Sequence, residues 1–276
     1  FLYLRADVTP PLAEQTAEIM RRIEPVLDAE RPAVLVVVGD VNSTIASALV
    51  AAKKGIPVAH VEAGLRSYDR TMPEEVNRVL TDQVSEWLFT TERQAAGNLL
   101  REGIDERKIH FVGNVMIDTL LGHRPHAVPA AETLAAAPAI FLETLRGFGV
   151  LTLHRPSNVD AKESLVSIMC AFADISRKMP VIFPMHPRTR ARLTEFGIDL
   201  GDSNITILDP VGYHDSLALT QSARCVVTDS GGLQEESTFF KTPCLTLRPN
   251  TERPVTIAVG SNRLIKTHEV FERLDE

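Results

Sequence analysis

The chain has 276 residues, a formal net charge of −7, 44% hydrophobic residues and 24% charged residues. This length and balance predict two globular domains, each with a substantial apolar core. The acidic charge argues against a nucleic-acid-binding surface, and no apolar run is long enough for a membrane span. We therefore expect a cytoplasmic protein, without a signal peptide, that binds neither nucleic acid nor membranes.

The first half of the chain alternates short apolar runs with amphipathic stretches, which is typical of a parallel sheet covered by helices. The apolar runs predict strands at 33–38, 56–61, 87–90 and 109–112. The first strand is rich in β-branched residues and is expected to be buried on both faces. Helices are predicted at 43–54, from Pro73 onward and at 92–101, the first capped by Asn42 or Ser43 and ended by Gly55.

The stretch from 122 to 147 is rich in proline and alanine and predicts a linker with one short helix at most. Alternation then resumes, with strands predicted at 150–153, 181–183, 205–208, 225–228 and 244–247 and helices at 162–177, 215–221 and 233–240. We thus expect two Rossmann-like doubly wound α/β domains, residues 1–121 and 148–276. Phe1–Leu4 resembles a strand already under way and 273–276 a helix cut short, so we expect a fragment.

The three cysteines are too few and too scattered for a disulfide framework or a zinc knuckle. Cys170, Cys225 and Cys244 each have apolar neighbours in the sequence. We expect all three to be buried, reduced thiols, which fits a cytoplasmic protein.

Polar residues follow six of the predicted strands, at the carboxyl ends where ligands bind to open parallel sheets. A polar residue after a single strand is common, so by itself it is weak evidence for a binding site. Six with acidic, basic or anion-binding character favour a site in a cleft. They are Asp40, Glu62, His154, His186, Asp229 with Ser230, and Arg248.

The segment Asp229-Ser230-Gly231-Gly232 lies between a buried strand and a helix. Two glycines there allow backbone N–H groups to approach a phosphate at a helix N-terminus, and Glu236, one turn later, can bind a ribose hydroxyl. The alternative is a tight turn that needs glycine at positive φ. The segment matches neither a P-loop nor a G-x-G-x-x-G motif.

Several acidic residues have a simple structural explanation beside the catalytic one. Glu74 stands on one helix face with Asn77 and Arg78, and it can merely complement the helix dipole. Glu62 can pair with a nearby arginine, and Asp40 can cap the following helix. Their shared place at strand ends of one domain favours catalysis.

The basic candidates carry similar alternatives. His154 and His186 can be ordinary loop histidines, and Arg253 can bind phosphate or pair with Glu252. Metal ligation is disfavoured because no metal-binding spacing occurs.

Taken together and in order, five segments resemble the non-hydrolysing UDP-N-acetylglucosamine 2-epimerases. They are His60-Val61-Glu62-Ala63-Gly64-Leu65-Arg66, Pro73-Glu74-Glu75-x-Asn77-Arg78, Thr152-x-His154-Arg155, the segment from Asp229 to Glu236, and Thr251-Glu252-Arg253-Pro254. The resemblance spans essentially the whole chain. It implies a glycosyltransferase-B (GT-B) fold, in which two Rossmann-like domains face a cleft.

The resemblance also implies a reaction, namely interconversion of UDP-GlcNAc and UDP-ManNAc by inversion at sugar C2. UDP is eliminated to give 2-acetamidoglucal and then adds back, without NAD or a metal. Asp40, Glu62, Glu74 and His154 match the catalytic positions of the family. Ser230, Gly231, Gly232, Glu236 and Arg253 match its substrate-binding positions, and Arg155 and His186 match a second, regulatory site.

Some features of this chain depart from the family pattern. About 60 residues of the first domain, judged from the size of a Rossmann half, are expected to precede this chain, and a C-terminal helix to follow it. Arg155 is followed by Pro156-Ser157-Asn158, and Ser216 stands where many members carry a phenylalanine that contacts uracil.

The family also suggests a homodimer that serves cell-surface polysaccharide synthesis. Alternatives left open are a 2-epimerase for another UDP-sugar, a form that hydrolyses the intermediate to ManNAc, and a non-catalytic nucleotide-sugar-binding protein.

Overall fold

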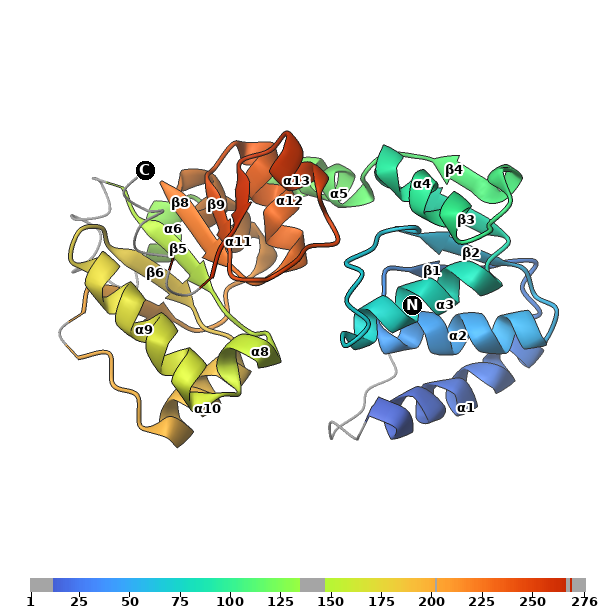
Figure 1. Ribbon diagram of the computed structural model, residues 1–276, viewed down its shortest axis with the longest axis horizontal. Coiled ribbons are helices and arrows are strands. Elements are labelled where there is room, and N and C mark those ends of the chain that lie inside the picture. Colours follow the sequence, from blue (N-terminus) through green and yellow to red (C-terminus); the bar gives the residue numbers. More distant parts are fainter. Residues whose placement is uncertain (1–11, 135–146, 202, 267–268, 270–276) are drawn as a thin grey trace. The chain divides into compact units, whose positions relative to one another are not determined.

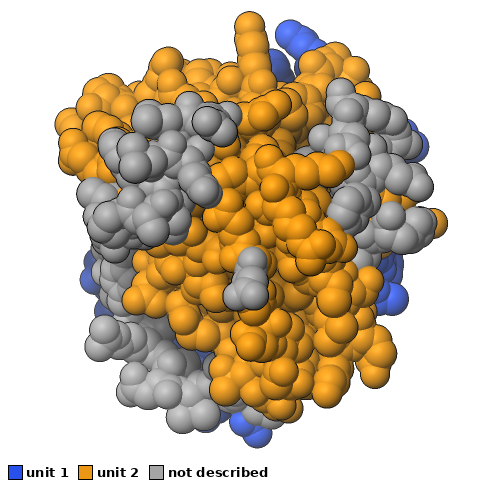
Figure 2. All heavy atoms as spheres, turned by 90° about the vertical axis from the view of Figure 1, so that its left-hand side faces the viewer, with its two compact units in different colours: residues 1–115 blue, residues 116–276 orange. Residues whose placement is uncertain are grey.

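A computed structural model describes residues 12–134, 147–201, 203–266 and 269. The chain forms two compact units, residues 1–115 and 116–276, which are coloured separately in Figure 2. Among the described residues, no helix combines the length and the apolar character needed to cross a membrane.

The first unit contains a four-stranded parallel sheet in the order β1-β2-β3-β4. The strands are β1 (Leu35–Val38), β2 (Val58–Val61), β3 (Trp87–Thr90) and β4 (Ile109–Phe111). The connecting elements are helices α1 (Leu12–Glu30), α2 (Asn42–Lys53), α3 (Pro73–Val84) and α4 (Arg93–Arg101) and the 3₁₀ turn η1 (Glu106–Lys108). Since every pair is parallel, the carboxyl ends of β1 and β2 lie at the same edge of the sheet.

Local sequence explains how two of these helices begin and end. Pro73 occupies the first turn of α3, where its missing N–H costs nothing, and Glu74 and Glu75 complement the helix dipole. Gly55 follows α2 with φ +72°, the left-handed conformation that glycine adopts readily. The predicted side-chain cap of α2 is wrong, because the N-cap position is Val41, which makes no side-chain hydrogen bond.

The prediction that the first strand is buried on both faces is also wrong. Val36 and Val38 are 57% and 53% exposed, whereas Val37 between them is 6% exposed. Val37 packs with Ala48 and Val50 of α2, and α1 lies outside α2 (Figure 1). Among the described residues, helices therefore cover only the Val37 face of this edge strand.

The second unit contains a six-stranded parallel sheet in the order β10-β9-β8-β5-β6-β7. The strands are β5 (Gly149–Thr152), β6 (Val181–Pro184), β7 (Ile205–Leu208), β8 (Cys225–Thr228), β9 (Cys244–Thr246) and β10 (Asn262–Leu264). Helix α5 (Val115–His123) begins at the last residue of the first unit and otherwise belongs to the second. The other helices are α6 (Ala130–Leu134), α8 (Pro156–Val159), α9 (Lys162–Ser176), α10 (Pro187–Phe196), α11 (Tyr213–Ser222), α12 (Gly231–Phe240) and α13 (Val255–Ala258), with the 3₁₀ turn η2 (Arg124–His126).

This strand order is that of the Rossmann fold. The chain builds β5, β6 and β7 outward in one direction, then returns to the other side of β5 and builds β8, β9 and β10. In such sheets the direction reverses between the two central strands, and ligands bind outside their carboxyl ends. The reversal here lies between β5 and β8, so the residues after Thr152 and after Thr228 occupy the favoured place for a ligand.

The core of the second unit is built from the apolar runs that predict its strands. Leu151, Phe183 and Val227 from the sheet pack with Ile168 and Phe172 of α9. Cys225 and Cys244 are buried free thiols, but Cys170 is exposed, so the prediction that all three are buried is wrong at that position. Cys170 lies on α9 next to Met169, which is 1% exposed, and it falls on the outer side of an amphipathic helix.

The predicted linker and chain ends fall partly outside the described residues. Within 122–147, the end of α5, η2 and α6 belong to the second unit, where η2 and α6 pack on α11. Residues 135–146 lie outside the described part of the chain, as do Phe1–Leu4 and 273–276.

Candidate functional site

In the first unit, the predicted acidic residues Asp40 and Glu62 follow the neighbouring strands β1 and β2. Gly39 precedes Asp40 with φ +68°, and a Cβ atom at this glycine would lie 4.0 Å from Glu62 Oε2. Glu62 itself has φ +67°, a left-handed conformation that costs a non-glycine residue about 1–3 kcal/mol and tends to occur at functional sites. The structure thus brings the turns that carry these two carboxylates together.

Helix α3 fixes the position of the Asp40 turn. Arg78 forms ion pairs with both Asp40 and Glu75, and Asn77 Nδ2 donates to the backbone oxygen of Asp40 over 2.9 Å. Arg78 is 3% exposed, so this pairing is largely shielded from water. Asp40 therefore pairs with an arginine on another element rather than capping α2.

Glu75 ties the same helix to the segment after β2. It accepts hydrogen bonds from the backbone N–H and hydroxyl of Ser67, both at 2.9 Å, and from the N–H of Tyr68 at 2.8 Å. Burial alone would raise the pKa of Glu75, but these hydrogen bonds and the charge of Arg78 hold it below the ordinary value. Glu75 is thus an ionised anchor for this loop.

Beneath these turns lies a buried pair, His60 and Asp82, to which the sequence analysis assigned no role. His60 Nε2 lies 2.8 Å from the backbone oxygen of Gly39, and Nδ1 lies 2.7 Å from Asp82 Oδ1. A carbonyl oxygen can only accept, so Nε2 carries a hydrogen, and the short contact on the other side requires a second proton between Nδ1 and the carboxylate. Asp82 also accepts from Gly64 N at 3.1 Å and pairs with Arg66 at 2.7 Å.

The third predicted carboxylate, Glu74, lies in the first turn of α3 and is half-buried. It precedes Asn77 and Arg78 by one turn, on the helix face that meets the Asp40 turn. Within the part of the chain that the structure describes, its carboxylate makes no hydrogen bond or ion pair. Glu74 therefore differs from Asp40 in having no arginine partner there.

In the second unit, the loops after β5 and β8 meet around the carboxylate of Asp229, which is fully buried. His154 Nδ1 lies 2.8 Å from Asp229 Oδ1, and the backbone N–H groups of His154 and Arg155 donate to the same carboxylate over 3.1 and 2.9 Å. Asn158 Nδ2 adds a further hydrogen bond of 3.1 Å. His154 itself remains 41% exposed at its side chain.

The glycine segment after Asp229 forms the N-terminus of α12, with Ser230 as N-cap. Neither Gly231 nor Gly232 has a positive φ, so the tight-turn explanation for these glycines is wrong. Space explains Gly231 instead, because a Cβ atom there would lie 2.6 Å from Glu252 Oε1. The first N–H groups of a ten-residue helix are suited to bind an anion.

Glu236 lies one turn further into α12 and is 5% exposed. Burial raises its pKa to about 7, aided by the charge of Glu235 and only partly opposed by a hydrogen bond from the Tyr213 hydroxyl. Burial and the Glu236 contact raise the pKa of Tyr213 to about 12, so Tyr213 is the donor of this bond. The structure thus presents a carboxyl group held close to half-protonated at neutral pH.

Arg253 lies within a buried ion-pair network beside this helix. Its guanidinium lies 2.7 Å from Glu235 and 3.3 Å from Glu252, and Glu252 also pairs with Arg248 at 2.7 Å. Burial alone would raise the pKa of Glu252, but the two arginines lower it to about 2. The pairing with Glu252 considered from the sequence is therefore present, and phosphate binding by Arg253 stays a prediction.

The two residues predicted for a second site, Arg155 and His186, lie beside His154. Arg155 Nε donates to the backbone oxygen of Asp229 over 3.0 Å, and the His186 ring centre is 5.8 Å from that of His154. His186 is the N-cap of α10, and its Nδ1 accepts from the N–H of Arg188 at 3.1 Å. Burial, His154 and Arg188 together lower the pKa of His186.

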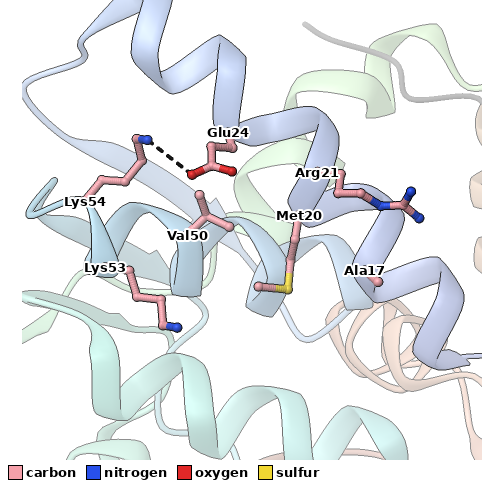
Figure 3. A pocket seen from close by; sticks show the side chains of 7 residues that line it. All are labelled: Ala17, Met20, Arg21, Glu24, Val50, Lys53 and Lys54. Atoms are coloured by element: carbon pink, nitrogen blue, oxygen red, sulfur yellow. Dashed lines mark hydrogen bonds and ion pairs between the residues drawn. The ribbon is translucent and has the colours of Figure 1, made fainter.

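One surface depression of the first unit lies away from the polar strand ends. It lies between α1 and α2, and Figure 3 shows Lys54 paired with Glu24 there at 3.4 Å. Lys54 also lies 2.8 Å from Asp28. Among the described residues, no group of three His, Cys, Asp or Glu side chains is placed to hold a metal ion.

Two findings from known proteins bear on these residues. The family model described as UDP-N-acetylglucosamine 2-epimerase matches residues 2–272. The UDP-N-acetylglucosamine 2-epimerase of Methanocaldococcus jannaschii is 48% identical over 257 residues, which cover 91% of this chain and 70% of that protein.

A second relative has a different substrate in its name. The UDP-2,3-diacetamido-2,3-dideoxy-D-glucuronate 2-epimerase of Pseudomonas aeruginosa is 42% identical, covering 91% of this chain and 69% of that protein.

The fold has a solved counterpart as well. A crystal structure of the M. jannaschii UDP-GlcNAc 2-epimerase in complex with UDP-GlcNAc and UDP has a TM-score of 0.87 and 45% identity, covering 97% of this chain and 75% of that one. The predicted GT-B fold with two parallel-sheet α/β domains is thereby confirmed.

Proposed function

Because the chain belongs to the UDP-N-acetylglucosamine 2-epimerase family, we propose that it is an isomerase that interconverts UDP-GlcNAc and UDP-ManNAc by inversion at sugar C2. The observation that carries the proposal is the 48% identity to a UDP-N-acetylglucosamine 2-epimerase across 91% of the chain. The anion site at the start of α12 and the carboxylates after β1 and β2 supply what such a reaction needs.

The second unit binds the nucleotide. Ser230, through its hydroxyl, and the backbone N–H groups of Gly231 and Gly232 hold the diphosphate at the N-terminus of α12. Glu236 accepts hydrogen bonds from the ribose, and Arg253 contributes positive charge. The Rossmann switch point between β5 and β8 supports this assignment, since ligands bind at that place in doubly wound sheets.

The first unit supplies the proton chemistry. A carboxylate among Asp40, Glu62 and Glu74 removes the C2 proton while the bond between C1 and the UDP oxygen breaks. UDP and 2-acetamidoglucal result. Return of a proton to the opposite face of C2, with addition of UDP to C1, gives the epimer. His154, next to the diphosphate site, stabilises the negative charge that develops on the departing UDP.

Proton NMR of UDP-GlcNAc in D₂O tests this function. Formation of UDP-ManNAc with deuterium at C2 supports both the epimerisation and its proton-abstraction step. UDP binding without exchange or product would overturn the epimerase and leave a non-catalytic nucleotide-sugar-binding protein. Release of free ManNAc would identify a form that hydrolyses the intermediate.

A second candidate substrate comes from the P. aeruginosa relative at 42% identity. UDP-2,3-diacetamido-2,3-dideoxy-D-glucuronate differs from UDP-GlcNAc at sugar C3 and carries a carboxylate. Competition between the two UDP-sugars in one reaction mixture measures their ratio of kcat/KM. A higher kcat/KM for the uronate would make it, rather than UDP-GlcNAc, the preferred substrate.

We further propose a cytoplasmic homodimer that serves cell-surface polysaccharide synthesis, as the family suggests. The mass of the assembly by light scattering tests the dimer, and a monomeric mass at working concentration would overturn it.

A further inference from the structure

The carboxylate of Asp229 lies at the centre of the loops that carry both the histidine and the phosphate-binding glycines. It is fully buried and directly precedes Ser230 at the start of α12. Four donors converge on it, namely the N–H groups of His154 and Arg155, Asn158 Nδ2 and the imidazole of His154. Burial alone would raise the pKa of Asp229, but these partners, led by His154, hold it below the ordinary value.

The contact with the imidazole determines where His154 carries its hydrogen. Nδ1 lies 2.8 Å from Asp229 Oδ1, and an ionised carboxylate can only accept, so Nδ1 must donate. The neutral ring is therefore the Nδ1–H tautomer, and any proton that His154 gains or gives is held at Nε2. A carboxylate partner of this kind sets both the tautomer and the orientation of an imidazole.

The neighbouring histidine has the opposite arrangement. His186 Nδ1 accepts from the N–H of Arg188, so the neutral His186 ring carries its hydrogen on Nε2. Its pKa is lowered by burial and by the charge of His154, whose ring centre is 5.8 Å away. Of the two rings, His154 is the one whose Nδ1 is paired directly with the Asp229 carboxylate.

We propose that Asp229 is a positioning residue for the reaction: it keeps a hydrogen on His154 Nδ1, so that the ring takes its second proton at Nε2 and the resulting Nε2–H donates to the diphosphate bound at the adjacent start of α12. This rests on the proposed function, in which His154 stabilises the departing UDP. Asp229 acts through His154, and its neighbour Ser230 begins the phosphate-binding turn. The buried carboxylate of Asp229 thus links His154 to the turn that begins at Ser230 and binds the diphosphate.

The substitution Asp229→Asn tests the coupling because it keeps the size of the side chain and removes its charge. The amide oxygen can still accept from the backbone N–H groups, but the amide nitrogen then faces Nδ1, so Nδ1–H loses its acceptor and the ring loses the support for a proton on both nitrogens. We expect kcat to fall at least about a hundredfold, the scale of a lost acid–base group. Asp160→Asn is the matched control, since Asp160 is a partly exposed carboxylate in the same unit, paired with Arg188 and Arg192.

A double-variant comparison separates positioning from a merely structural role. If Asp229 acts through His154, adding Asp229→Asn to His154→Gln lowers kcat no further. A further loss of tenfold or more in the double variant would overturn the proposal.

The tautomer itself is read by ¹⁵N NMR of the protein labelled at its eight histidines, at a pH where the ring is neutral. The signal missing from His154→Gln assigns the ring. The parent is expected to show the hydrogen on Nδ1, and a parent that carries it on Nε2 would overturn the proposal even if Asp229→Asn fails to fold. This readout needs no turnover, so it remains decisive if the protein proves inactive on UDP-GlcNAc.

Discussion

The raised pKa of Glu236 leads to a testable prediction. Ionisation of this buried carboxyl is expected to destabilise the free folded protein but to favour UDP binding. The folded protein holds this carboxyl with a pKa of about 7 against an ordinary value of 4.5. Each tenfold difference in proton affinity is worth about 1.4 kcal/mol, so an ionised Glu236 costs the free protein about 3 kcal/mol. The folded state keeps the proton up to about pH 7, whereas the unfolded chain loses it near 4.5. Stability therefore falls as pH rises through this window.

Replacing the group by its neutral isostere removes the penalty. Glu236→Gln is expected to match the parent in unfolding free energy at pH 5 and to exceed it by about 1–3 kcal/mol at pH 8, a range that allows for the buried amide. Urea denaturation at pH 5, 6, 7 and 8 measures the difference. Glu163→Gln, at an exposed carboxylate of α9 in the same unit, is the control and should show no such trend. A gain that does not grow with pH would refute the reasoning.

UDP binding should respond in the opposite sense. Ribose hydroxyls donate to an ionised carboxylate, so UDP binding to the parent must remove the proton below pH 7. The ratio of UDP affinity between parent and Glu236→Gln is then expected to rise with pH by up to about tenfold per pH unit below 7 and to level off above it. Because both variants bind the same UDP, the effect of UDP ionisation on affinity cancels in this ratio. A UDP affinity ratio that stays constant with pH in calorimetric titrations would contradict ribose binding by Glu236.

Three further predictions concern single positions. Gly231→Ala places a Cβ against Glu252 and the phosphate turn, so we expect a loss of about 1–3 kcal/mol in urea denaturation and at least about tenfold in UDP affinity. Gly122→Ala, in open space on α5, should be neutral or stabilising, and equal UDP affinities in the two variants would contradict this account. Glu74→Gln should lower turnover at least about a hundredfold by NMR assay with UDP binding nearly unchanged, and normal turnover would reduce Glu74 to a helix-dipole residue. Cys170 alone should react rapidly with a thiol reagent in the folded protein, because burial raises the pKa of the other two thiols; three fast thiols would refute that.

The sheets were predictable from the sequence because their strands are short β-branched runs bounded by polar residues. The predicted strands at 87–90, 205–208 and 225–228 coincide with β3, β7 and β8. Helices α1, α5, α8, α10 and α13 and strand β10 were missed, although the signals for α1 and α10 are present. In α1, apolar residues recur at helical spacing despite Pro25 within the helix, and α10 begins with Pro187 and ends at Gly197 with φ +63°.

The residue types of the candidate site were also predictable, but their partners were not. A strand end identifies His154 and Asp229 separately, yet the two are 75 positions apart and meet only because β5 and β8 are neighbours in the sheet. Arg78 reaches Asp40 in the same way, from a helix on another part of the chain. Such pairings depend on strand order, and strand order is not encoded in the local pattern of either segment.

Several buried charged side chains lie beneath the turns that carry Asp40 and Glu62 in the first unit. Their role is to position these carboxylates. Arg66, Arg78 and Asp82 are each at most 3% exposed, and removing one member of such a pair typically costs about 3–5 kcal/mol. Apolar residues of similar volume would often be as stable, so stability alone does not explain the network. What the charges provide is geometry, since Asp82 and His60 hold the turns after β1 and β2 while Arg78 holds Asp40. A proton abstraction at carbon depends on such fixed distances, and we therefore regard this network as part of the catalytic apparatus rather than of the core.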